Sequence, residues 1–168
     1  MARAGEAALL QTMLAGFEAM LAEEEAEAGR RLGDDDAAVR AFHLHQARVL
    51  SLSLYAVRRQ LAAGRTLQAR APRTWEVFTA GGCSLHVAGI VANQVTGVSD
   101  EHAAVLDATA AELVQRERPS LVERRLTKLR EQLDADTAIA RHRTASNRRW
   151  VGARPRPDGQ ATLTIEST

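Results

Sequence analysis

Several residue types are scarce in this sequence, and each shortage excludes a class of protein. Cys83 is the only cysteine in 168 residues, which excludes an internal disulfide framework and a cysteine-rich zinc site. The longest stretch without an ionised side chain, residues 77–99, contains four glycines and several polar residues, so it is not typical of a membrane span. Glu6 and Gln11 interrupt the N-terminal apolar stretch, and no signal-peptide cleavage site follows. We therefore expect a cytoplasmic protein with no membrane contact.

Lysine is almost absent, because 21 of the 22 basic residues are arginine and Lys128 is the exception. Together with 32 alanines, this bias indicates a GC-rich coding sequence. The arginine count alone is therefore no argument for nucleic-acid binding, and any such argument must depend on where the arginines cluster.

The residues that are abundant favour helices. Alanine, leucine, arginine and glutamate dominate, and these side chains lose little rotamer freedom in a helix. Hydrophobic residues make up 45% of the chain, and aromatic residues make up 4%. That content suits one domain of 168 residues rather than two. We predict a mainly α fold, a single domain of about six helices closed by a C-terminal β-hairpin.

Apolar periodicity and capping residues place the elements. The predicted helices cover residues 6–28, 36–63, 73–80, 85–95, 99–117 and 120–146. Gly64 is expected to end the second helix and residues 65–72 to form a linker. Ser84 is expected to cap the helix after it, and either Ser99 or Asp100 the next one. Ser120 and Glu123 have the spacing of a capping box. Strands are predicted at 150–154 and 160–166 around a turn at 155–159. The single domain 1–168 thus divides into an N-terminal helix pair (1–63), central helices (72–146) and a hairpin (149–166).

Charge is distributed unevenly along the chain. Residues 1–40 hold nine acidic and four basic residues, whereas residues 116–156 hold twelve basic and five acidic ones. Between 141 and 157 there are six arginines and no acid, and arginine forks match phosphate oxygens. The candidate phosphate-contacting residues are Arg141, Arg143, Arg148, Arg149, Arg154 and Arg156. A solvated helix end, or pairing with the acidic N-terminal region, explains the same cluster, and both interpretations stay open.

The C-terminal third carries a resemblance to a known family. Its residues are the run Asp134-Ala-Asp-Thr-Ala-Ile-Ala-Arg-His-Arg, then Arg148-Arg149-Trp150-Val151, then the segment from Arg154 to Leu163. An earlier block, Pro72 to Ala88, fits as well. Over roughly residues 41–165 the chain resembles the 13E12-repeat family, the domain of unknown function found N-terminal to HNH endonuclease modules in actinobacteria and their phages.

That resemblance implies a helical module in a DNA context, and in complete members a nuclease module often follows the helical domain. No His-Asn-His pattern is present in this chain, so no catalytic residue is carried over. Both a natural end at Thr168 and a truncation relative to such members stay open.

The remaining candidate sites, for a metal, a nucleophile or a DNA-binding motif, are better explained by ordinary structural roles. His43 and His45 lie two residues apart, on nearly opposite faces of a helix, which is unsuitable for a shared metal. Cys83 before a helix start could be a nucleophile, but we expect a small residue at a tight turn. Three adjacent aspartates, 34–36, are more typical of a helix start than of a calcium loop. Residues 73–95 have helix–turn–helix lengths, but the second helix, 85–95, has no arginine or lysine, so we expect core or a protein interface.

We therefore expect a non-catalytic helical module that contacts the backbone of double-stranded DNA through its basic C-terminal segment. The alternative is a helical protein-interaction or oligomerisation module without nucleic-acid binding, in which the first two helices supply the interface. We expect no cofactor, no metal and no small-molecule ligand, and the partners are DNA or a second copy of the chain. An enzymatic role is disfavoured but stays open, because two carboxylates can meet in space.

Overall fold

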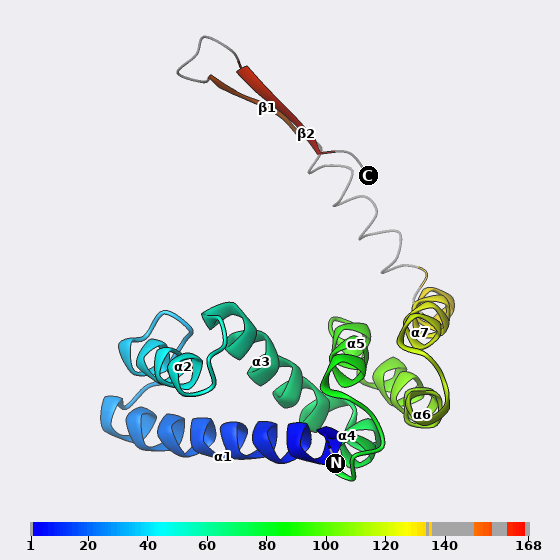
Figure 1. Cartoon of the computed structure of the whole chain (residues 1–168), viewed down its shortest axis with the longest axis horizontal. Helices are drawn as coiled ribbons and strands as arrows, with labels where there is room; N and C mark the ends of the chain where they lie inside the picture. The colour runs from blue at the N-terminus through cyan, green and yellow to red at the C-terminus, as the bar shows by residue number, and fades with distance from the viewer. Residues whose placement is uncertain (1, 134, 136–149, 156–160, 167–168) are drawn as a thin grey trace. The chain divides into compact units, whose positions relative to one another are not determined.

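Seven α-helices make up most of the described chain in the computed structural model, which describes residues 2–133, 135, 150–155 and 161–166 (Figure 1). The prediction of a mainly helical fold is confirmed. The chain divides into two compact units, Met1–Arg130 and Glu131–Thr168. One domain across all 168 residues stays a prediction. The helices are α1 (Ala2–Ala28), α2 (Ala37–Val49), α3 (Leu54–Arg70), α4 (Pro72–Thr79), α5 (Leu85–Val95), α6 (Asp100–Arg116) and α7 (Pro119–Leu133).

The helix predicted at 36–63 is wrong, because two helices occupy this region and the linker predicted at 65–72 is largely helical. The chain breaks at Ser51, which has a φ of 53°, a left-handed conformation that is unusual for a residue with a side chain. Ser53 then caps α3, since its side-chain oxygen accepts a hydrogen bond from the Ala56 amide at 3.1 Å. The predicted N-terminal helix pair is therefore a set of three helices.

The prediction that Gly64 ends a helix is wrong, because this residue lies in the interior of α3. A Cβ atom at this position would lie 2.6 Å from Cδ1 of Leu14, so the glycine allows α1 and α3 to pack closely. α1 lies along the lower edge of the helical unit in Figure 1 and packs on α2, α3, α4 and α5. Its apolar stripe is buried against these helices and consists of Ala7, Leu10, Met13, Leu14 and Phe17.

The core is assembled from segments far apart in the sequence. Each fully buried leucine contributes about 1.5–3 kcal/mol relative to an exposed one. The largest fully buried side chains come from α1, α3, α4, α6 and α7, and are Leu10, Leu14, Leu67, Phe78, Leu106 and Leu126. No helix within the described ranges is both long enough and apolar enough to cross a membrane.

Two of the central helices, α5 and α6, begin where the sequence predicts. Ser84 and Ser99 cap α5 and α6, and their side-chain oxygens accept hydrogen bonds from the amides of Val87 and His102. The capping box predicted at Ser120 is wrong, because α7 already begins at Pro119. Proline suits the first position of a helix, since its φ is fixed and its missing N–H would have no partner there.

Two strands lie in the second unit. β1 (Trp150–Pro155) pairs antiparallel with β2 (Ala161–Glu166), with Ala153 opposite Leu163. The predicted turn at 155–159 lies almost wholly outside the described residues, so the hairpin itself stays a prediction. The same holds for the end of the last predicted helix, because residues 134 and 136–149 lie outside the described ranges.

Candidate functional site

The arginines predicted to contact phosphate fall mostly where the structure gives no description. Arg141, Arg143, Arg148, Arg149 and Arg156 lie outside the described residues. Arg154 lies in β1, where its backbone pairs with Thr162. The basic region nevertheless begins earlier in the sequence, at Arg116, and α7 with the residues just before it is the part of that region whose side chains the structure describes.

α7 presents basic side chains on the face that points away from the core. Val122 and Leu126 are fully buried, whereas Arg124 and Lys128 are exposed. Each basic residue follows its buried neighbour by two positions, which is about 200° around a helix. Arg124 and Lys128 are themselves one turn apart and therefore lie side by side. We call these two residues the basic face of α7.

The charges of this face are not neutralised by neighbours in the helical unit. Among the described residues, neither Arg124 nor Lys128 forms an ion pair, and the same is true of the exposed Arg118 just before the helix. Arg125 differs, because its guanidinium lies 3.3 Å from the carboxylate of Glu117. Unpaired, adjacent, exposed cations are the arrangement that attracts a polyanion.

Arg130 orients the basic face, although it does not belong to it. Its guanidinium donates hydrogen bonds to the carbonyl oxygens of Asn93, Gln94 and Thr96, at 3.0, 2.9 and 2.8 Å. These carbonyls lie at the end of α5, where backbone acceptors lack partners within the helix. A hydrogen bond of 3.0 Å between Gln94 and Thr127 adds to this contact. α7 is thus fixed to α5 with Arg124 and Lys128 turned outward.

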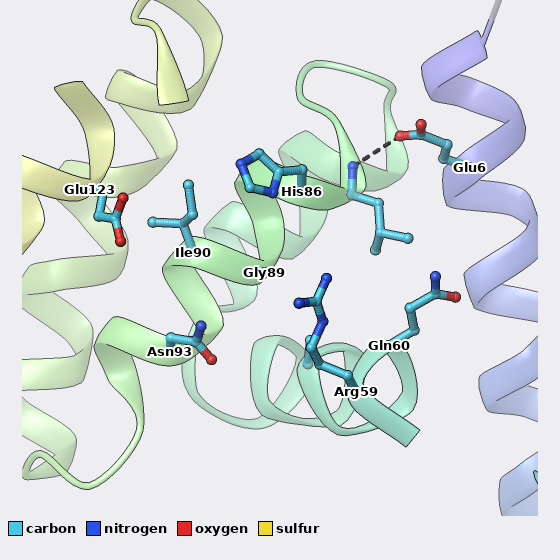
Figure 2. Close-up of a pocket in the computed structure, with 10 residues that line it drawn as sticks. Glu6, Arg59, Gln60, His86, Gly89, Ile90, Asn93 and Glu123 are labelled. Atoms are coloured by element: carbon cyan, nitrogen blue, oxygen red, sulfur yellow. Dashed lines mark hydrogen bonds between the residues drawn. The ribbon is translucent and has the colours of Figure 1, made fainter. Parts of the chain in front are cut away.

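A second feature is a cleft of about 430 Å³ over one face of α5 (Figure 2). α5 is buried on most of its circumference, as the first of the two interpretations of this block, core rather than a protein interface, requires. The remaining face lines the cleft. Figure 2 shows Arg59 extending from α3 toward α5, with Gln60 beside it on α3 and Glu123 of α7 on the other side of the view. The residues that α5 itself contributes are Leu85, His86, Gly89, Ile90 and Asn93.

Glu6 closes the cleft from α1. Its Oε2 atom accepts a hydrogen bond of 2.9 Å from the backbone amide of Leu85, in the first turn of α5 (Figure 2). This amide has no acceptor within its own helix, so the carboxylate satisfies it and complements the helix dipole. Glu6 therefore has a structural partner, which distinguishes it from the other charged residues of the cleft.

The other candidate residues are placed as follows. Cys83 is buried, and burial raises the pKa of its thiol to about 11, so it is a poor nucleophile at neutral pH. His43 is buried and His45 is exposed, which confirms that they lie on different faces. Asp36 is the N-cap residue of α2, as expected for this aspartate cluster. Among the residues with described positions, no group of three His, Cys, Asp or Glu side chains could hold a metal ion.

Asp36 also has a charged partner in the loop before α2. Its carboxylate accepts hydrogen bonds from the Arg30 guanidinium and from the Gly33 amide. These bonds, with the Arg30 bond as the larger cause, lower the pKa of Asp36 to about 2. This exposed ion pair holds the loop between α1 and α2, so we do not assign Asp36 to a ligand-binding site.

No protein-family model, no curated protein and no solved structure matches the chain. The interpretation of function therefore depends on the charges, the cleft and the resemblance of the C-terminal residues.

Proposed function

We propose that this chain is a non-catalytic helical module that contacts the phosphate backbone of double-stranded DNA through its basic C-terminal third. The contact would consist of Arg141, Arg143, Arg148, Arg149, Arg154 and Arg156, and the basic face of α7, in the other unit, would make phosphate contacts of its own. Phosphate contacts position a protein on DNA without reading its sequence. The resemblance to the helical domain of HNH nuclease proteins supports this role, and such a module would act in the cytoplasm.

The observation that carries the proposal is the state of Arg124 and Lys128. They are exposed and adjacent on one face, and no described acid pairs with them. Among the described residues, no ion pair joins a basic residue after position 115 to an acidic residue of 1–40. The acidic N-terminal region instead pairs locally, as in the contact between Arg30 and Asp36.

The experiment is fluorescence anisotropy with a labelled duplex of about 25 base pairs at about 50 mM salt. One variant replaces Arg148, Arg149, Arg154 and Arg156 by alanine, and a second replaces Arg124 and Lys128 by glutamine. We expect the first to lose most of the binding and the second to weaken it. A matched control changes two exposed arginines of α2, Arg40 and Arg48, to glutamine and should bind like the unmodified chain. Equal loss in the control would overturn the proposal, because net charge alone would then explain binding.

A second candidate function is self-association or protein binding, and one observation favours it. Three large apolar side chains around the break between α2 and α3 are largely exposed: Leu44 by 58%, Val49 by 62% and Tyr55 by 72%. Exposed apolar surface of this kind is typical of protein interfaces. Sedimentation velocity over a range of concentrations tests it. Association that is lost in Val49→Ser and Tyr55→Ser, but not in Val105→Ser on α6, would support this function.

A further inference from the structure

The cleft over α5 contains two opposite charges that the fold does not use. Arg59 comes from α3 and Glu123 comes from α7. Within the part of the chain that the structure describes, neither side chain forms an ion pair or a hydrogen bond with another residue. We propose that this cleft binds a small zwitterionic ligand of the amino-acid or dipeptide class, whose carboxylate is held by Arg59 and whose ammonium group is held by Glu123.

The assignment of the two charged groups follows from elimination within the cleft. Glu6 is the other carboxylate, but it is bonded to the Leu85 amide and stabilises α5. Glu123 is therefore the acid without a described partner. Arg59 is the only arginine or lysine that lines the described cleft. A simple anion would meet Glu123 without compensation and a simple cation would meet Arg59, whereas a zwitterion satisfies both.

Two side-chain amides give the cleft the means to orient such a ligand. Gln60 lies next to Arg59 on α3, and Asn93 lies on α5 (Figure 2). Each amide offers one acceptor and two donors, and neither side chain is hydrogen-bonded to a described residue. The nearly buried Ile90 adds an apolar wall. A volume of about 430 Å³ falls within the range of small-molecule sites, roughly 300–1,000 Å³.

Gly89 supports the same conclusion. It lies in the middle of α5, where glycine is less favourable than alanine. A Cβ atom at Gly89 would meet no atom of a described residue within 4 Å, so packing among these residues does not require glycine there. The residue lines the cleft, and its missing side chain leaves room for a ligand to approach the helix backbone. Gly64 of α3 shows the contrast, since its missing side chain makes room for Leu14.

The test is isothermal titration calorimetry of the full chain with four probes. L-leucine and L-alanyl-L-leucine are zwitterions, N-acetyl-L-leucine lacks the ammonium charge, and L-leucinamide lacks the carboxylate. We expect at least one zwitterion to bind saturably at or below about 1 mM, the upper end of the usual range for metabolites. Each of the two singly charged probes should bind at least about tenfold more weakly, because one charge of the cleft then stays unpaired.

Three variants locate the binding site. Arg59→Gln and Glu123→Gln should each weaken binding of the zwitterion about tenfold or more. Gly89→Leu should abolish binding by filling the cleft, while Arg48→Gln on α2 should leave it unchanged. Circular dichroism verifies that each variant folds. The proposal is overturned if no zwitterion binds at about 1 mM, or if N-acetyl-L-leucine binds as tightly as L-leucine. DNA binding involves other residues and can fail or succeed independently of this result.

Discussion

The carboxylate of Asp107 accepts hydrogen bonds from both the backbone amide and the hydroxyl group of Thr74, at 2.9 and 2.7 Å. Its second oxygen accepts a bond of 3.0 Å from the Arg73 amide. α4 begins after Ala71, which has no side chain that could cap it, so Asp107 of α6 supplies the cap from more than thirty residues further along the chain. Both Asp107 and Thr74 are buried, and this contact joins α4 to α6.

Replacing Asp107 by alanine should destabilise the fold strongly. Three donors would lose their acceptor in a buried setting, and we expect the free energy of unfolding to fall by about 3 kcal/mol. Urea denaturation measures this change. Thr74→Val removes one of the three bonds and should cost less, and the double variant should show coupling between the two sites. A loss below about 0.5 kcal/mol in Asp107→Ala would contradict the capping role.

Ser51 and Ser53 should respond in opposite directions. Ser51 has a φ of 53°, which glycine adopts without steric cost, so Ser51→Gly should raise the free energy of unfolding by about 1 kcal/mol. Ser53 caps α3, so Ser53→Ala should lower it by about 1 kcal/mol. Chemical denaturation of the two single variants checks both signs, and a stabilising Ser53→Ala would show that the cap is unimportant.

The stability of the fold should decrease as the pH falls below 6.5. His43 is buried and stacks on Phe17 with ring centroids 5.4 Å apart, and its Nδ1 atom has no hydrogen-bond partner among the described residues. Burial, together with the charge of Arg58 and against the opposing charge of Asp34, lowers the pKa of His43 from its ordinary value of 6.5. As the pH falls, His43 therefore takes up a proton at a higher pH in the unfolded chain than in the folded one. The stability should fall between pH 6.5 and the lower pKa of the folded state.

Replacing His43 removes that dependence. In His43→Leu the slope of stability against pH in this window should decrease, whereas the exposed His45→Gln should retain it. Urea denaturation at several pH values gives the slope, and an NMR titration gives the pKa of His43 directly. A measured pKa above 6.5 for His43 would contradict this account.

Two glycines in helix interiors should also behave oppositely on substitution by alanine. At Gly64 the new Cβ would lie 2.6 Å from Leu14 Cδ1, so Gly64→Ala should destabilise by about 1–3 kcal/mol despite a better helix propensity. At Gly89 the new Cβ would meet no described residue within 4 Å, so Gly89→Ala should stabilise by about 0.5–1 kcal/mol. Thermal denaturation ranks the two variants, and a stabilised Gly64→Ala would show that α1 and α3 separate easily.

The sequence predicts the local features of this fold better than the distant ones. Ser84 and Ser99 cap their helices as expected, because the donor and the acceptor are three residues apart. The sequence predicts a helix end at Gly64 and is wrong there, because the reason for a glycine at this position is Leu14, fifty residues earlier in the chain. The break at Ser51 also escaped prediction, since serine rarely adopts a positive φ.

The candidate sites also combine features that are visible in the local sequence with features that depend on distant residues. The clustering of basic residues after position 116 is visible in the sequence, and so is the spacing of Arg124 and Lys128. The structural role of Arg130 is not, because its acceptors are carbonyl groups at the end of α5. The cleft could not be predicted either, and the sequence indicated no small-molecule ligand. Its residues come from α1, α3, α5 and α7, and only the packing of these helices brings them together.

The most direct test of the central claim is the salt dependence of DNA binding. The affinity of the chain for a duplex of about 25 base pairs is measured between about 50 and 200 mM salt. We expect log K to fall linearly with log salt, and the slope to become shallower by about one for each arginine or lysine removed that contacts a phosphate. Arg124→Gln/Lys128→Gln should show this change. No binding at the lowest salt, or a slope that this variant leaves unchanged, would contradict the account.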